Sequence, residues 1–145
     1  MRGGTSLAND PAMARDTDAD LAGIPVLIVQ DEQVTAKIIA TSLEACGCET
    51  RIAASAEEAI ALLVPFAPRA IVLDLVLPQL SGLVLAEQLK QDPTTRDIPI
   101  IATSIFSTQD AAQIARDAGC ADYVRKPIDP DSFARMLRDH IDRMK

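Results

Sequence analysis

The sequence predicts an α/β domain in which helices cover both faces of a five-stranded parallel sheet. Strand-like and helical segments alternate along the chain, and a strand is followed by a helix five times. The first, third and fourth strand-like segments are apolar without alternation, which is typical of parallel strands buried on both faces. The 145 residues suffice for one such domain. Its core must be aliphatic, since 48% of the residues are hydrophobic but only 3% are aromatic.

Each strand–helix unit has its own boundary signals. The expected strands cover residues 24–29, 50–53, 70–73, 98–103 and 123–125. The first expected helix covers residues 34–46 and ends at Gly47, and the second runs from Ser55 through 63, where a Ser55–Glu58 capping box opens it and Pro65 and Pro68 close it. The third covers residues 83–90 and follows Ser81 and Gly82. The fourth runs from Ser107 to Gly119 with Asp110 in its cap, and the fifth begins at Asp129 with Pro130 in its first turn. Residues 1–23 hold few apolar groups and are expected to be a disordered tail before a single domain over 24–145.

The number of strands favours one order of the sheet. Five such units with right-handed crossovers suit the doubly wound, flavodoxin-like order 2-1-3-4-5. Ligands of these sheets bind outside the carboxyl ends of the strands at the switch point, which here lies between the first and third strands. Asp31 and Glu32 follow the first strand and Asp74 follows the third. We expect these carboxylates to lie together, where their repulsion favours a hard divalent cation such as Mg²⁺.

Two further polar residues end strands at the same edge. Ser104 closes the fourth strand and Lys126 follows the fifth. A lone strand-end aspartate is usually a helix cap and a lone Lys-Pro is usually a turn, so the prediction depends on the combination. Carboxylates, a metal site, a hydroxyl and an ammonium at one edge indicate a site for a phosphoryl group carried on an aspartate.

With these residues the chain resembles a response-regulator receiver domain of the single-domain kind found among chemotaxis and cell-cycle regulators. The resemblance covers residues 24–143. It depends on the stretches LIVQDE (27–32), IVLDLVLPQLSG (71–82), IPIIATS (98–104) and AGCADYVRKPI (118–128).

The resemblance implies a role for each matching residue. Asp74 corresponds to the phosphoacceptor, and Asp31 to the acidic residue that binds Mg²⁺ directly. By the same resemblance the backbone carbonyl of Val76 is a metal ligand, and the Ser104 hydroxyl is the sensor of the phosphoryl oxygen. Lys126 is the ion-pair partner of the phosphoryl group and has a cis bond to Pro127. Tyr123 is the switch aromatic, and Gly82 is the glycine after the phosphoacceptor loop.

Two positions depart from the family pattern, and two more carry apolar residues where the family tunes hydrolysis. Gln30 replaces a first acidic residue, so we expect weaker Mg²⁺ binding, with the amide oxygen holding a metal-bound water. Ile105 stands where the family favours Ala or Gly, and Phe106 and Val76 are apolar at positions that tune hydrolysis. The hypothesis is a shielded, long-lived aspartyl phosphate. A compatible alternative is that Ile105 and Phe106 form an apolar docking patch for a partner helix.

The implied function is a stand-alone switch rather than an enzyme with an external substrate. A histidine kinase or phosphotransfer protein would supply the phosphoryl group, and a downstream protein target would read the result. The alternative is a degenerate, phosphorylation-independent interaction module, which Gln30 and Ile105 favour. A haloacid-dehalogenase-type phosphatase would want an aspartate in place of Val76, and a flavodoxin would want a phosphate loop in place of residues 30–32.

Composition excludes other classes. The net charge of −7, without Trp or clustered basic residues, does not suit nucleic-acid binding. No apolar run approaches the roughly 18–20 residues of a membrane span. Three cysteines, an odd number, argue against a disulfide framework and favour a cytoplasmic location. We expect a monomer or a weak homodimer.

Overall fold

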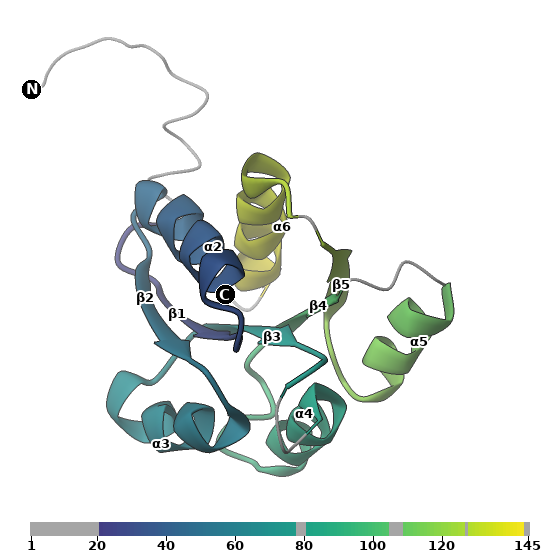
Figure 1. Cartoon of the computed structure of the whole chain (residues 1–145). Helices are drawn as coiled ribbons and strands as arrows, with labels where there is room; N and C mark the ends of the chain where they lie inside the picture. Colours follow the sequence, from purple (N-terminus) through teal and green to yellow (C-terminus); the bar gives the residue numbers. More distant parts are fainter. Residues whose placement is uncertain (1–20, 78–80, 105–108, 127, 144–145) are drawn as a thin grey trace, which may run out of the picture.

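The parallel sheet forms in the predicted strand order. The computed structural model describes residues 21–77, 81–104, 109–126 and 128–143. Its strands are β1 (Pro25–Val29), β2 (Glu49–Ala53), β3 (Ala70–Asp74), β4 (Ile100–Ser104) and β5 (Asp122–Arg125). They pair in the order β2-β1-β3-β4-β5, and every neighbouring pair is parallel (Figure 1). The predicted fold class is therefore confirmed.

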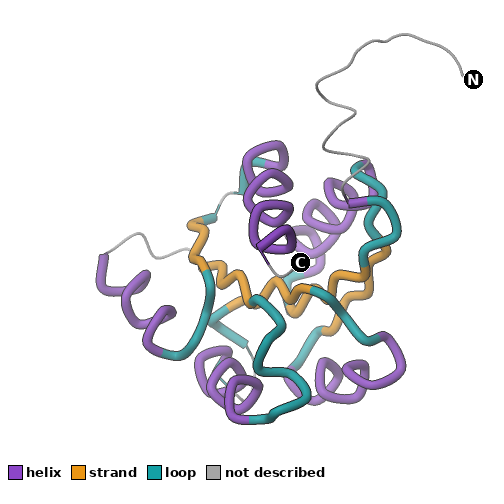
Figure 2. The backbone as a smooth tube through the Cα atoms, turned by 180° about the vertical axis from the view of Figure 1, so that it is seen from behind, coloured by secondary structure: helices purple, strands orange, loops and turns teal. Residues whose placement is uncertain are grey.

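Helices cover both faces of this sheet. They are α2 (Gln33–Ala45), α3 (Ala56–Phe66), α4 (Gly82–Gln91), α5 (Gln109–Asp117) and α6 (Pro130–Arg143). Helices α2 and α6 lie on one face, whereas α3, α4 and α5 lie on the other (Figures 1 and 2).

The two faces bury separate apolar clusters, which explains why the central strands show no alternation. Successive residues of β1, such as Leu27 and Ile28, point to opposite faces, and both are fully buried. Ile28 packs in the cluster below α2 and α6, which includes Leu43 and Phe133. Leu27 packs in the cluster that includes Leu85 of α4. Both positions of the strand must therefore be apolar.

The third helix runs past its predicted end. A stop at residue 63 before Pro65 is wrong, because α3 continues to Phe66 with Pro65 inside its last turn. A proline so near the end removes only one hydrogen bond of the helix. The helix then stops at Ala67, whose φ of 50° is left-handed and whose N–H donates to the carbonyl of Leu63.

The packed part of the chain begins before residue 24. Leu21, which the sequence places in the expected tail, is fully buried in the cluster of α2 and α6. The backbone N–H of Gly23 donates to the carbonyl of Gly47 at 2.8 Å, which ties this segment to the end of α2. The packed part of the described chain therefore includes Leu21, and the rest of the expected tail, residues 1–20, lies outside the described residues.

Candidate functional site

The carboxyl ends of the central strands bring the predicted polar residues to one edge of the sheet. Asp74 ends β3 beside Thr103 of β4, and Ser104 ends β4 beside Arg125 of β5. The N–H of Lys126 then donates to the carbonyl of Ser104 at 2.8 Å, which extends the β4–β5 pairing by one residue. Asp74, Ser104 and Lys126 therefore lie at the same edge of the sheet.

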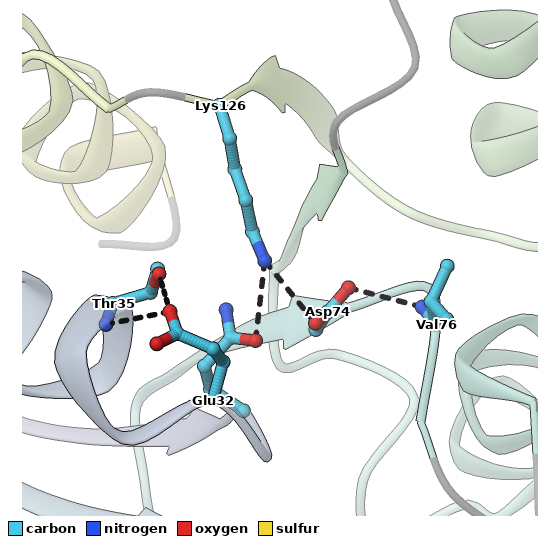
Figure 3. A network of polar contacts seen from close by, with 6 residues as sticks. Glu32, Thr35, Asp74, Val76 and Lys126 are labelled. Atoms are coloured by element: carbon cyan, nitrogen blue, oxygen red, sulfur yellow. Dashed lines mark hydrogen bonds and ion pairs between the residues drawn. The ribbon is translucent and has the colours of Figure 1, made fainter.

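Asp74 lies at the centre of this edge and is only 5% exposed. Its Oδ1 accepts a hydrogen bond of 3.0 Å from the backbone N–H of Val76. Its Oδ2 lies 3.2 Å from Nζ of Lys126 (Figure 3). A backbone donor and an ammonium thus hold a nearly buried carboxylate in one orientation.

Lys126 has a second contact that the sequence did not reveal. Its Nζ also donates to Oε1 of Gln30 at 3.2 Å, so the ammonium bridges β1 and β3. Gln30 is 1% exposed, and its Nε2 has no hydrogen-bond partner among the described residues. Two sequence signals pointed to Gln30, its place directly after an apolar strand and its match to the family's first acidic position, and they indicate a site residue but not its partner.

Glu32 does not join the predicted carboxylate cluster. Its Oε1 accepts from the backbone N–H of Thr35 at 3.0 Å and from the Thr35 hydroxyl, so that Glu32 is the N-cap of α2 (Figure 3). The hydroxyl of Thr35, followed by its backbone N–H, holds the pKa of Glu32 below its usual value. Glu32 therefore caps a helix, although it lies close in the chain to residues of the candidate site.

The remaining site candidates have contrasting exposure. Asp31 is exposed, and so is Val76 at 57%. Ser104 is 1% exposed at the end of β4. Tyr123 is half-buried on β5 against the cluster of α3, α4 and α5. Ile105, Phe106 and Pro127 lie outside the described residues, so hydrolysis tuning and the cis bond stay predictions.

Gly82, which was assigned from the sequence by resemblance alone, makes a close contact with the backbone of the phosphoacceptor loop. A Cβ added there would lie 2.3 Å from the carbonyl oxygen of Asp74 and 2.8 Å from Cα of Leu75. The N–H of Gly82 donates to the carbonyl of Leu75 at 3.1 Å. The start of α4 therefore packs directly against the backbone of the candidate phosphoacceptor, and only glycine permits this approach.

The donor set suits Mg²⁺, although with little negative charge. Within the described part of the chain, no three His, Cys, Asp or Glu residues come close enough to hold a metal ion. Of the carboxylates that the sequence predicts as metal ligands, Asp31 and Asp74 are left once Glu32 caps α2. Mg²⁺ commonly takes one or two carboxylates and completes its octahedron with waters and carbonyl oxygens, so these residues fit it.

Comparison with known proteins identifies the family. Residues 26–138 match the response regulator receiver domain. The polar-differentiation response regulator DivK of Brucella ovis is 34% identical over 116 residues, which cover 80% of this chain and 94% of DivK. A putative response regulator from Chloroflexus aurantiacus superposes with a TM-score of 0.80 at 29% identity, over 83% of this chain and 98% of that one.

One similar structure carries a metal. The receiver domain of a sensor histidine kinase from Pseudomonas aeruginosa, solved with a magnesium ion coordinated in its active-site cleft, superposes with a TM-score of 0.76 at 27% identity. The alignment covers 83% of this chain and 99% of that domain.

The family match and the similarity to DivK show that the chain belongs to the response regulator receiver domain family of two-component signalling. No helix in the part of the chain that the structure describes is long and apolar enough to cross a membrane.

Proposed function

We propose that this protein is a stand-alone response regulator that accepts a phosphoryl group on Asp74 and signals by binding another protein. The observation that carries the proposal is the contact between Lys126 and Asp74, at 3.2 Å, at the switch point of the sheet. DivK supports the stand-alone reading, since the match covers 94% of its length. The donor is a histidine kinase or a phosphotransfer protein that carries phosphohistidine.

The chemistry needs a positioned nucleophile and charge neutralisation. A carboxylate oxygen of Asp74 attacks phosphorus, the new P–O bond forms, and the P–N bond to the donor histidine breaks with its electron pair leaving on the imidazole nitrogen. Lys126 neutralises charge on the phosphoryl oxygens, and the hydroxyl of Ser104 donates to one of them. Asp31, Asp74 and the backbone carbonyl of Val76 would hold Mg²⁺, which supplies further charge neutralisation when bound.

The output would be a shift between two conformations. A phosphoryl group adds negative charge and new acceptor oxygens beside Ser104 and Lys126, and it favours the state in which these groups approach it. Ser104 and Tyr123 lie on the neighbouring strands β4 and β5, so a movement of Ser104 can reach Tyr123. The face formed by α5, β5 and α6 would then present a changed surface to a target protein.

Phosphotransfer to an Asp74 variant tests this proposal. Radiolabelled histidine kinases and phosphotransfer proteins from the same genome would be incubated with the wild type, Asp74→Asn and Asp97→Asn in the presence of Mg²⁺. Asp97 is an exposed aspartate that precedes β4 at the opposite edge of the sheet, so D97N is a matched control. We expect hydroxylamine-labile label on the wild type and on D97N, and none on D74N.

Other outcomes have distinct meanings. Equal labelling of wild type and D74N would overturn the site. An unlabelled wild type, with every donor active on its own partner, would favour the phosphorylation-independent module. Acetyl phosphate is a weaker donor for this test, because Ile105 replaces the small residue that the family favours at the entrance.

A further inference from the structure

Gln30 places a neutral acceptor where it shares the ammonium of Lys126 with Asp74. Nζ of Lys126 lies 3.2 Å from Oε1 of Gln30 and 3.2 Å from Oδ2 of Asp74. An acidic residue at position 30 would instead put the ammonium between two carboxylates. The amide oxygen keeps the hydrogen bond to Lys126 but removes one full negative charge from the site.

The buried setting of Gln30 fixes its orientation. Its backbone N–H donates to the carbonyl of Ala53 at 2.9 Å, and the residue is 1% exposed, so its side chain has little contact with solvent. Rotating the amide by half a turn would turn Nε2 toward the ammonium, donor against donor. The orientation with Oε1 toward Lys126 therefore persists even though Nε2 has no partner among the described residues.

The charge balance of the site follows from these contacts. Asp31, Glu32 and Asp74 each carry one negative charge and Lys126 carries one positive charge; the charge of Glu32 still acts on Lys126, although Thr35 holds its carboxylate at the N-terminus of α2. The sum is −2, where a carboxylate at position 30 would make it −3. Because the attraction of a divalent cation scales with this charge, the unphosphorylated site attracts Mg²⁺ less strongly than a site with an acidic residue at position 30.

We propose that Gln30 is a positioning residue that makes Lys126, rather than Mg²⁺, the standing counter-ion of the unphosphorylated Asp74. Mg²⁺ then binds the free protein weakly and binds well only once a phosphoryl group adds its negative charge. Metal and phosphoryl group thereby raise each other's affinity, since such coupling is reciprocal. This inference rests on the proposed function for the role of Asp74, but the contacts and charges of the free protein carry it.

Calorimetric Mg²⁺ titration of the full-length, unphosphorylated protein tests the inference without any phosphotransfer. Gln30→Glu adds the missing charge at nearly constant size, and Gln30→Asp adds it on a shorter side chain. We expect each to tighten Mg²⁺ binding by about tenfold or more, which corresponds to one added charge facing a divalent ion at about 6 Å in a water-like dielectric. Gln30→Leu removes the acceptor but adds no charge, so its affinity for Mg²⁺ should stay as weak as that of the wild type.

A spectroscopic readout separates positioning from a mere charge effect. The Cε signal of Lys126 in the nuclear magnetic resonance spectrum of the free protein should shift in Gln30→Leu, because the ammonium loses one of its two acceptors. Lys126→Met should tighten Mg²⁺ binding, since it removes the competing cation from Asp74.

Each result decides the inference. Wild-type Mg²⁺ affinity equal to that of both Gln30→Glu and Gln30→Asp would overturn it, and so would an unchanged Lys126 signal in Gln30→Leu. If Gln30→Asp fails to fold, Gln30→Glu gives the same readout at wild-type size. Loss of phosphotransfer in every variant and in the wild type would overturn the proposed function and leave these affinities to be judged separately.

Discussion

The ammonium of Lys126 lies 3.2 Å from Oδ2 of Asp74 although 52 residues separate the two in the chain. The parallel sheet accounts for this proximity, because β4 alone lies between β3 and β5 and all three end at the same edge. The Lys126 and Asp74 side chains are only 15% and 6% exposed. Water therefore replaces either partner poorly if the other is removed.

Replacing Lys126 with Met should destabilise the protein, because it leaves the nearly buried carboxylate of Asp74 without its counter-ion. The expected loss in the free energy of unfolding is about 1–3 kcal/mol, below the range for fully buried pairs since the site opens at the sheet edge. Urea denaturation at neutral pH measures it. In the double variant D74N/K126M most of the loss should disappear, and an effect of D74N on stability that is the same in the wild type and in the K126M background would show that the two side chains do not interact.

Much of the fold was predictable because burial restricts residue type. Strands covered on both faces must be apolar at successive positions, as Leu27 and Ile28 are, and this pattern is visible without a structure. The site was predictable for a related reason. A charged residue directly after such a strand, as Asp74 is after β3, has to lie at the sheet edge where parallel strands end.

The features that could not be predicted from the sequence depended on which of several competing contacts forms. Glu32 could have faced the site, but Thr35 offers it both a hydroxyl and a backbone N–H at the start of α2. Pro65 could have ended α3 at once, but one lost hydrogen bond in a last turn is tolerated. The contact between Gln30 and Lys126 joins residues 96 positions apart, and residue type alone does not specify it.

Only Cys46 should react quickly with a thiol reagent in the native protein. Burial raises the pKa of Cys48 to about 12 and that of Cys120 to about 11, so both stay protonated and covered near pH 8. Cys46 is half-buried at the end of α2. Titration with Ellman's reagent should show one fast thiol, and Cys46→Ser should abolish that phase. Fast reaction of a second thiol would mean that Cys48 or Cys120 is more accessible than the structure shows.

The contribution of Glu32 to stability should depend on pH in a defined direction. Its pKa in the folded protein lies below the usual value of 4.5, chiefly because the Thr35 hydroxyl donates to it. A lowered folded-state pKa gives stabilisation that is present above 4.5 and lost as the pH falls through the folded-state pKa. The urea midpoint of the wild type should therefore exceed that of Glu32→Gln near neutral pH, and the two should converge in acid.

Thr35→Val serves as the control for this effect, because it removes the hydroxyl but keeps the backbone N–H and the side-chain shape. In the Thr35→Val background, Glu32→Gln should cost less stability and the pH dependence of the difference should shrink. An unchanged pH dependence in that background would assign the lowered pKa of Glu32 to some other interaction.

Gly82→Ala should damage the site even though helix propensity alone favours Ala by about 1 kcal/mol. The added Cβ would meet the carbonyl oxygen of Asp74 at 2.3 Å, and since both this oxygen and Cα of Leu75 belong to the backbone, no side-chain rotation relieves the clash. We expect α4 to shift, the free energy of unfolding to fall by about 1–3 kcal/mol, and phosphotransfer to slow markedly. Gly23→Ala is the control, since its Cβ would meet nothing within 4 Å and only its φ of +76° opposes Ala. That variant should lose stability but keep wild-type phosphotransfer, and wild-type phosphotransfer by Gly82→Ala would show that Asp74 tolerates movement of its own backbone.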